Sequence, residues 1–406
     1  MGRTAQRVVV VGASLGGLRA AEQLRRAGFA GEIVVIGEEP HMPYNRPPLS
    51  KTALASEPDF GKLAFAPGPD AADAVWRLGR TVVTADLPGH TVTLADGSGL
   101  TWDGLVVASG LRPRRLVLPG PAGGRHVVRT LEDARALRTA LAAGRRVVVV
   151  GAGFVGCEVA ATATGLGADV TVVAPEPVPM LRPLGEELGT ALLRRHESQG
   201  VRFVLGRMPT ALHGDDTLTA VELSDGSVLA ADVLVEAVGC APRTEWLTGN
   251  GLDLSDGALC DNRLRVGPYE DVVAVGDVAR FPNPRYDDTP RRVEHWSIPG
   301  DTAVRAADTL AAALDGRAPD AAPFAPLPTF WSDQFDIRLK SFGAPDLGSQ
   351  DVRVLEGDPE GAAVVGYHRD GELVGVVSTG SPRMVMPYRR RLLEPAADDA
   401  PVATAG

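Results

Sequence analysis

The sequence predicts an α/β protein that contains two β-α-β units and a smaller α+β domain near the C-terminus. Two observations support this prediction. A strand-like run, a glycine-rich turn and a helix-like run occur in this order twice, at residues 7–25 and again at 146–161. From about residue 322 the alternation of strands and helices gives way to short strand-like runs. The chain has 406 residues, which is enough for two or three domains.

Composition excludes several classes of protein. The net charge is −10, from 41 basic and 51 acidic residues, which argues against binding to nucleic acid or to an anionic membrane. No apolar run approaches the roughly 18 residues that span a bilayer, and no signal-peptide pattern is visible. Cys157, Cys240 and Cys260 are too widely spaced for a disulfide framework or a Cys-x-x-Cys site. We therefore expect a cytoplasmic protein with reduced thiols and no bound metal.

The first β-α-β unit starts with a β-branched run that leads into the turn Gly12-Ala13-Ser14-Leu15-Gly16-Gly17. This turn matches the G-x-G-x-x-G fingerprint, except that Ser14 replaces the middle glycine. Glycine is needed here because a dinucleotide pyrophosphate approaches the backbone closely at the helix N-terminus. Glu38 ends the next strand-like run, about 20 residues past the turn, where a carboxylate binds an adenosine ribose.

The second unit repeats the pattern with the turn Gly151-Ala152-Gly153-Phe154-Val155-Gly156. Two fingerprints between strand and helix predict two Rossmann-like dinucleotide-binding domains. The strand that follows the second helix ends at Ala174, and Glu176 is the candidate ribose ligand. No Arg or Lys at 174–178 can receive a 2′-phosphate, and Arg182 is the nearest candidate. NADH is therefore the expected coenzyme, with NADPH possible.

Other short sequence motifs indicate the order of the elements in the rest of the chain. Small-residue turns follow strand-like runs at Ala108-Ser109-Gly110 and at Gly239-Cys240-Ala241. Asp277 follows the run at 272–275, at the edge where α/β sheets bind ligands. Prolines at 323, 326 and 328 indicate a linker, and Asp370-Gly371 indicates a hairpin turn. Residues 394–406 are rich in Ala, Asp and Pro, and we expect them to be frayed.

Together these phrases resemble the glutathione-reductase-like flavoproteins, and within them the ferredoxin reductases of the putidaredoxin-reductase and dioxygenase-reductase kind. The most specific segment is Pro43-Tyr44-Asn45-Arg46-Pro47-Pro48-Leu49-Ser50-Lys51. The glutathione-reductase branch has a Cys-x-x-x-x-Cys dithiol in this neighbourhood, whereas no cysteine precedes Cys157 here, which excludes a dithiol relay. The resemblance implies that hydride from NAD(P)H reaches FAD. Electrons then leave singly for a [2Fe-2S] ferredoxin that serves a cytochrome P450 or another oxygenase.

The resemblance also implies domain limits and a cofactor site. FAD would bind a discontinuous domain, 1–109 and 244–321, and NAD(P) would bind 110–243; the C-terminal domain would be 322–393 and the tail 394–406. The FAD site would contain Gly12, Ser14, Gly16, Gly17, Glu38, Arg46, Lys51, Val83, Ala108, Gly110, Arg129, Asp277, Trp296 and Trp331. The NAD(P) site would contain Gly151, Gly153, Phe154, Gly156, Glu176 and Gly239. Asp277 would bind the ribityl chain, while Trp296 and Trp331 would lie near the isoalloxazine ring.

Lys51 and Glu158 are the expected catalytic residues. In the family these positions form an ion pair beside flavin N5. A fixed ammonium stabilises the negative charge that hydride brings to the ring, and the carboxylate keeps the lysine ionised and oriented. The chain has only three lysines, Lys51, Lys62 and Lys340, and otherwise uses Arg. A lysine at position 51 therefore suggests that a compact charge is preferred to a planar guanidinium.

We expect a basic surface that binds the ferredoxin, and two alternative functions are compatible with the same scaffold. A positive rim for an acidic ferredoxin would draw on Arg291, Arg292, Arg338, Lys340, Arg383 and Arg389–Arg391. One alternative is a reductase of rubredoxin or another one-electron acceptor on the same scaffold. The other is a flavin-binding interaction protein similar to the apoptosis-inducing-factor branch, which the lack of a long basic insert disfavours.

Overall fold

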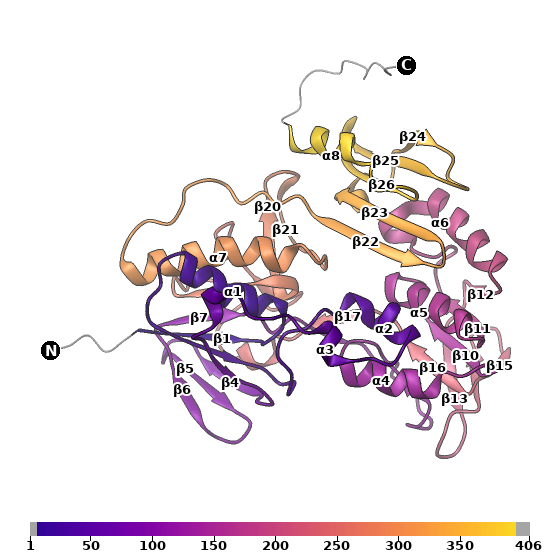
Figure 1. The fold of residues 1–406 in the computed structure, drawn as a ribbon, viewed down its shortest axis with the longest axis horizontal. Coiled ribbons are helices and arrows are strands. Elements are labelled where there is room, and N and C mark those ends of the chain that lie inside the picture. Colours follow the sequence, from indigo (N-terminus) through magenta and orange to yellow (C-terminus); the bar gives the residue numbers. More distant parts are fainter. Residues whose placement is uncertain (1–5, 395–406) are drawn as a thin grey trace.

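The computed structural model describes residues 6–394, in which three units are each built around a five-stranded sheet (Figure 1). Two sheets are parallel and the third is antiparallel, so the predicted α/β class with an α+β C-terminal domain is confirmed. Within residues 6–394, no helix combines the length and the apolar character needed to cross a membrane.

The first sheet has the strand order β19-β7-β1-β2-β3. Its strands are β1 (Arg7–Val11), β2 (Glu32–Ile36), β3 (Val75–Arg77), β7 (Gly104–Val107) and β19 (Val272–Ala274). Helices α1 (Leu15–Arg26) and α7 (Ile298–Asp315) lie side by side against this unit (Figure 1). The valines of β1 are buried because a parallel sheet is covered on both faces. β19 lies far along the chain from β7, so the chain returns to the first sheet after it has formed the second.

Smaller elements surround the first sheet. Two three-stranded sheets belong to this unit: β4 (Val82–Asp86), β5 (Thr91–Leu94) and β6 (Gly99–Thr101); β18 (Ala258–Leu259), β20 (Ala279–Asn283) and β21 (Asp287–Arg292). The segment after β2 contains η1 (Pro47–Ser50), α2 (Thr52–Ala55), α3 (Phe60–Leu63) and η2 (Pro69–Ala71). The label η denotes a short 3-10 helix; two more are η3 (Glu245–Leu247) and η4 (Gly276–Val278), and η5 (Pro345–Gly348) packs on the C-terminal sheet.

The second sheet has the order β12-β11-β10-β16-β9. Its strands are β9 (Arg125–His126), β10 (Arg146–Val150), β11 (Asp169–Ala174), β12 (Arg202–Leu205) and β16 (Val233–Glu236). Its helices are α4 (Leu131–Ala140), α5 (Phe154–Gly165) and α6 (Leu181–Ser198), and a small sheet contains β13 (Pro209–His213), β14 (Ala220–Leu223) and β15 (Val228–Ala230). Strands β8 (Leu111–Pro113) and β17 (Cys240–Pro242) pair with each other where the chain enters and leaves this unit.

The C-terminal sheet has the order β22-β23-β26-β25-β24. Its elements are β22 (Thr329–Gln334), β23 (Ile337–Gly343), β24 (Val352–Gly357), β25 (Ala363–Arg369), β26 (Glu372–Ser378) and helix α8 (Met386–Leu393). The predicted hairpin at Asp370-Gly371 joins β25 to β26, and both residues have positive φ, 54° and 85°, as a two-residue turn of this kind requires. Figure 1 shows this sheet above α5 and α6 of the second unit, and β22 packs on α5.

The domain limits given above, 1–109 with 244–321, 110–243 and 322–393, stay a prediction. The proline-rich stretch that precedes β22 has no regular secondary structure. Of the predicted frayed tail, residues 395–406 lie outside the described part of the chain.

Candidate active site

Both glycine-rich turns bring the backbones of strand and helix into direct contact. A Cβ atom on Gly12 would lie 2.0 Å from the carbonyl oxygen of Ala108, and one on Gly17 would lie 1.9 Å from the carbonyl oxygen of Gly12. The second turn repeats these contacts: a Cβ on Gly151 would lie 2.3 Å from a backbone oxygen, and one on Gly156 1.9 Å from another. Close packing of strand and helix therefore requires glycine at these four positions.

The middle position of each turn is different. A Cβ on Gly153 would meet no atom within 4 Å, and Ser14 occupies the matching position in the first turn. These two residues are the N-caps of α5 and α1, both with extended backbone and neither with a side-chain cap. Each helix thus starts with backbone N–H groups that no capping side chain satisfies. This arrangement fits the pyrophosphate of FAD in the first unit and of NAD(H) in the second.

Lys51 and Glu158 meet at the junction of the two units. Lys51 directly follows η1, a turn that two prolines stiffen, and its Nζ lies 2.6 Å from Oε2 of Glu158 on α5. The exposed fractions of the two side chains are 14% and 5%, so the ion pair is largely shielded from water. In this environment a fixed ammonium has a stronger effect on a neighbouring negative charge than it has in water.

Two serines that the sequence analysis missed also bind Glu158. Ser50 Oγ donates to Oε2 at 2.5 Å, and Ser332 Oγ of the C-terminal sheet donates to Oε1 at 2.6 Å. A signal for Ser332 was present, because strand alternation places it on the opposite face of β22 from Trp331. Nothing in the local sequence indicated that this face lies against α5.

The segment that precedes Lys51 is held by Arg46. Its guanidinium pairs with Glu39 at 2.5 Å, donates to the backbone oxygen of Arg129 at 2.7 Å and donates to Ser14 Oγ at 3.1 Å. Tyr44 donates to the same Glu39 carboxylate, and burial raises the pKa of the Tyr44 hydroxyl. Arg46 thus links the first fingerprint turn, the Lys51 segment and the start of α4.

Asp277 and Arg129 lie next to each other. Arg129 Nη2 is 3.9 Å from Asp277 Oδ2, and Gly110, with φ of 64°, lies next to the same guanidinium. Burial raises the pKa of Asp277 to about 6, although Arg129 acts in the opposite direction. Burial also disfavours the charged form of His295, and it lowers the pKa of this imidazole to about 4.

The aromatic residues predicted beside the isoalloxazine ring come from two units. The rings of Trp296 and Trp331 lie edge to face, with centroids 6.4 Å apart. Lys340 Nζ lies 5.5 Å from the centroid of the Trp331 ring, within range of a cation–π interaction. Phe154, at the start of α5, packs against Phe330 at 4.9 Å. The structure therefore brings Trp296, Trp331 and the start of α5 to one region.

Glu38, the residue predicted to bind the adenosine ribose, forms an ion pair with Arg243 that nothing in the local sequence indicated. Val83, in β4, is exposed. In the second unit, Glu176 is half-buried just past β11, and Gly239 has φ of 87° in open space. Arg207 is a further residue that nothing in the local sequence indicated.

Arg207 is a cation next to the end of β11, where the sequence predicts that the coenzyme binds. Its backbone N–H donates to the carbonyl oxygen of Ala174 at 3.2 Å, which places it at the tip of β11. Its guanidinium binds Asp225 at 2.9 Å. Arg182, the candidate named from the sequence, is an exposed residue in the first turn of α6. Folding thus adds a cation that proximity in sequence did not reveal.

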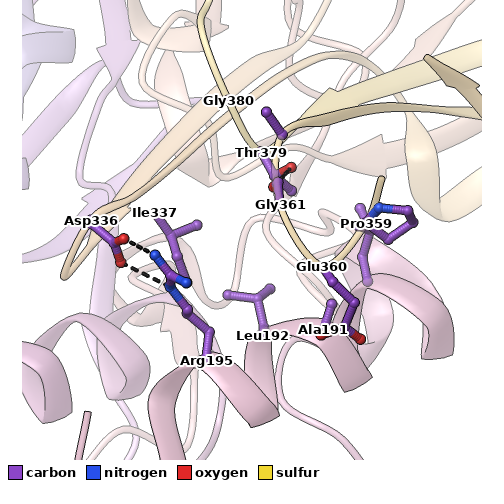
Figure 2. Close-up of a pocket in the computed structure, with 12 residues that line it drawn as sticks. Ala191, Leu192, Arg195, Asp336, Ile337, Pro359, Glu360, Gly361, Thr379 and Gly380 are labelled. Atoms are coloured by element: carbon purple, nitrogen blue, oxygen red, sulfur yellow. Dashed lines mark hydrogen bonds and ion pairs between the residues drawn. The ribbon is translucent and has the colours of Figure 1, made fainter. Parts of the chain in front are cut away.

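One cavity, of about 270 Å³, lies apart from these residues, between α6 and the C-terminal sheet (Figure 2). Its lining includes Ala191, Leu192 and Ile337, and Figure 2 shows the ion pair of Arg195 with Asp336 at its edge. None of the predicted cofactor residues lines it.

Most of the chain matches two known protein families. Residues 6–302 match the pyridine nucleotide-disulphide oxidoreductase family, and residues 329–405 match the reductase C-terminal family. The chain belongs to the pyridine nucleotide-disulphide oxidoreductase family. As a member of this family it is an oxidoreductase that uses FAD and NAD(H), which confirms the cofactors expected from the fingerprints and the resemblance together.

Several relatives are similar over almost their whole length. The probable ferredoxin reductase CtmF of Castellaniella defragrans is 36% identical over 382 residues, which cover 93% of this chain and 91% of CtmF. The ferredoxin–NAD(+) reductase component of the anthranilate 1,2-dioxygenase system of Burkholderia cepacia is 36% identical, over 96% of this chain and 95% of that protein. Among solved structures, the covalent putidaredoxin reductase–putidaredoxin complex matches with a TM-score of 0.87 at 30% identity, over 95% of this chain and 93% of that chain.

This family member has no dithiol in the usual neighbourhood. All three thiols are free, and Cys157 and Cys260 are buried. Burial raises the pKa of Cys157 to about 12, so its thiolate is not available at neutral pH. The Cys-x-x-x-x-Cys dithiol of the glutathione-reductase branch is therefore missing from this chain.

Proposed function

We propose that this protein is an NAD(P)H-dependent, FAD-containing reductase that passes electrons to a small [2Fe-2S] ferredoxin. The ferredoxin in turn serves a cytochrome P450 or another oxygenase. The observation that carries this proposal is the buried Lys51–Glu158 ion pair at the junction of two dinucleotide-binding units, in a chain without a dithiol. The names of the relatives support it, since they describe ferredoxin reductases and components of dioxygenase systems.

The roles of the residues follow from their chemistry. Bound FAD supplies an acceptor for two electrons that can release them one at a time. Lys51 holds a positive charge at the junction, where negative charge develops when hydride arrives. Glu158 keeps that ammonium in place, and its own carboxylate is satisfied by Ser50 and Ser332. Arg46 and Arg129 position the segments around Asp277, the proposed ligand of the ribityl chain.

We place the ferredoxin surface at the C-terminal sheet, around Trp331. Lys340 lies over its ring, and both Lys340 and Arg389 lie over Phe342. An acidic partner is attracted to such cations. Two of the predicted rim residues fit less well: Arg291 pairs with Asp287, and Arg292 pairs with Asp256 and Glu294. Their charges are already neutralised, so we omit them from the surface.

A cytoplasmic location and the domain limits stated above belong to the same proposal. Three free thiols suit a reducing compartment, where NADH is also available. The discontinuous first domain, 1–109 with 244–321, is supported by the pairing of β19 with β7. Cell fractionation with an antibody to the protein tests the location.

The experiment that tests the function is electron transfer by the purified protein. NADH should bleach the flavin absorption, and cytochrome c should be reduced only when a [2Fe-2S] ferredoxin is added. Rubredoxin in place of ferredoxin tests the first alternative, and faster reduction of rubredoxin would favour it. Rapid bleaching without transfer to any one-electron acceptor would favour the flavin-binding interaction protein instead. A protein that binds no FAD when FAD is supplied would contradict the proposal.

A further inference from the structure

We propose that the C-terminal domain completes the Lys51–Glu158 site: Ser332 is a positioning residue that fixes the Glu158 carboxylate, and Gln334 and His196 hold Ser332. The consequence for hydride transfer rests on the proposed function. The contacts themselves do not, because they are made by side chains of this chain alone.

Strand β22 presents alternate residues to the second unit. Phe330, Ser332 and Gln334 are buried, whereas Asp333 is exposed and Trp331 lies on the opposite face near Trp296. Each of the three buried side chains contacts a helix of the second unit: Phe330 contacts Phe154 on α5, Ser332 contacts Glu158 on α5, and Gln334 contacts His196 on α6. One strand thus has one face toward the ferredoxin surface proposed above and the other toward the ion pair.

The two oxygens of Glu158 have different partners. Lys51 and Ser50, both from the first unit, bind Oε2, whereas Ser332 is the donor to Oε1. Within residues 6–394, Oε1 has no other hydrogen-bond donor. A buried carboxylate oxygen without a donor is strongly unfavourable, so loss of Ser332 would favour rotation of the carboxylate away from its present position. Because Oε2 binds Lys51, such a rotation would also release the ammonium.

The Ser332 hydroxyl is itself oriented by a buried chain of hydrogen bonds. Gln334 Nε2 donates to Ser332 Oγ at 3.0 Å and to the thioether of Met180 at 3.2 Å, a group that can only accept. This fixes the amide with Oε1 toward His196 Nε2, at 2.7 Å. An amide oxygen only accepts, so Nε2 of His196 carries the proton. Burial lowers the pKa of His196, which keeps the ring neutral.

The hydrogen bonds therefore all run in one direction: His196 donates to Gln334, Gln334 donates to Ser332, and Ser332 donates to Glu158. Ser332 accepts from Gln334 and so has its own proton free for the carboxylate. Hydrogen bonds arranged in sequence polarise one another, which strengthens the last one. The members are almost completely buried, and they come from α5, α6 and β22. The ion pair is thus held by residues of all three units.

The test compares Ser332→Ala with two controls in the FAD-loaded, full-length protein. Ser332→Thr keeps the hydroxyl and should therefore keep the wild-type rate of flavin reduction. Ser341→Ala removes an equally buried hydroxyl from the neighbouring strand, opposite Phe330, where Ser341 Oγ has no hydrogen-bond partner among the described residues. Stopped-flow reduction of the flavin by NADH should be about tenfold slower in Ser332→Ala, as for loss of a hydrogen bond to a charged group. It should be close to wild type in both controls.

The second readout does not depend on turnover. The chain has three lysines, so acylation of Lys51 relative to exposed Lys62 can be measured by peptide mass spectrometry. If Ser332 holds Glu158 in place, Ser332→Ala should raise the ratio of Lys51 to Lys62 labelling by about threefold, because the ion pair opens more often. Gln334→Met, which leaves Ser332 but removes its donor, should shift both readouts in the same direction and covers the case in which Ser332→Ala does not fold.

The two readouts separate the possible failures. Unchanged Lys51 labelling in Ser332→Ala and Gln334→Met overturns the proposal even if flavin reduction is slow, since the effect then does not pass through the ion pair. Raised labelling with an unchanged reduction rate also overturns it. If NADH does not bleach the wild-type protein at all, the proposed function fails, and the labelling ratio alone decides whether Ser332 positions the pair.

Discussion

The ammonium of Lys51 lies 2.6 Å from the carboxylate of Glu158, although the two residues belong to different dinucleotide-binding units. The contact closes the junction between η1 of the first unit and α5 of the second. A pair with this little exposure to water is strongly affected by loss of either partner, because the remaining charge stays buried and unpaired. This property makes the roles of the two residues measurable.

Lys51→Met should slow reduction of the flavin by NADH about 10²-fold, which corresponds to about 2.7 kcal/mol of lost transition-state stabilisation. Glu158→Gln should also slow this step. Because both substitutions break one interaction, the effect of the double mutant should be smaller than the product of the single effects. Stopped-flow measurements at the flavin absorption maximum give the three rates.

The same variants provide an internal control. After chemical reduction by dithionite, Lys51→Met should pass electrons to ferredoxin at nearly the wild-type rate, because the ammonium acts when hydride arrives. Fully multiplicative effects, or a defect confined to the ferredoxin step, would show that the two residues are not a hydride-transfer pair.

NADH should have a higher kcat/KM than NADPH, by about tenfold or about 1.4 kcal/mol. NADH is preferred because Arg207, the cation near the end of β11, is already bound to Asp225 and is not free for a 2′-phosphate. The preference is modest because β11 ends at Ala174, so no acid at the tip of this strand repels the 2′-phosphate. Residual activity with NADPH should depend on this arginine. Steady-state kinetics of Arg207→Ala should therefore show a loss with NADPH and little change with NADH, and equal losses with both coenzymes would contradict this role.

The two glycines of the second fingerprint should respond differently to alanine. Gly153→Ala places Cβ where no protein atom lies within 4 Å, so the free energy of unfolding should change by less than about 1 kcal/mol. The KM for NADH should rise about tenfold, because the pyrophosphate needs this space. Gly156→Ala is the matched control: its Cβ would lie 1.9 Å from Gly151 O, so the fold itself should be destabilised by more than about 3 kcal/mol. Urea unfolding and NADH titration distinguish the two effects, and an unchanged KM in Gly153→Ala would refute the placement.

Asp277→Asn should change how the stability of the flavin-free protein depends on pH. The raised pKa, about 6, means that the folded protein holds a proton on Asp277 more tightly than the unfolded chain, whose pKa is near the ordinary 3.8. Well below pH 3.8 both states are protonated and there is no penalty. As the pH rises from 4 to 6 the unfolded chain ionises first, so stability falls, by about 1–3 kcal/mol in all.

The asparagine variant cannot ionise and should escape this loss. Relative to wild type it should therefore be more stable at pH 7 than at pH 4 by the same amount. Urea unfolding curves at pH 4, 5, 6 and 7 provide the measurement. A difference in stability between the variant and wild type that does not vary with pH would contradict the raised pKa of Asp277 in the folded protein.

The two β-α-β units, their fingerprints and the hairpin at Asp370-Gly371 could be predicted from the amino-acid sequence. These features depend on neighbours in the chain: β-branched runs, glycines that permit close backbone contacts, and turn residues that tolerate positive φ. It also named Lys51 and Glu158, through a resemblance that extends over nearly the whole chain. The α/β class followed from the same local patterns, and the family followed from that resemblance.

The contacts between groups that are distant in the chain could not be predicted in this way. Ser332 is 174 residues from Glu158, and His196 is 138 residues from Gln334, so no local pattern could join them. Arg207 reaches Ala174 because β12 pairs with β11, and Arg243 reaches Glu38 where the chain leaves the second unit. Secondary structure arises from short-range preferences, whereas a buried polar contact forms only where packing removes water from two distant segments at once. For that reason the contacts of Ser332 with Glu158 and of Gln334 with His196 exist only because the third sheet packs on the second unit.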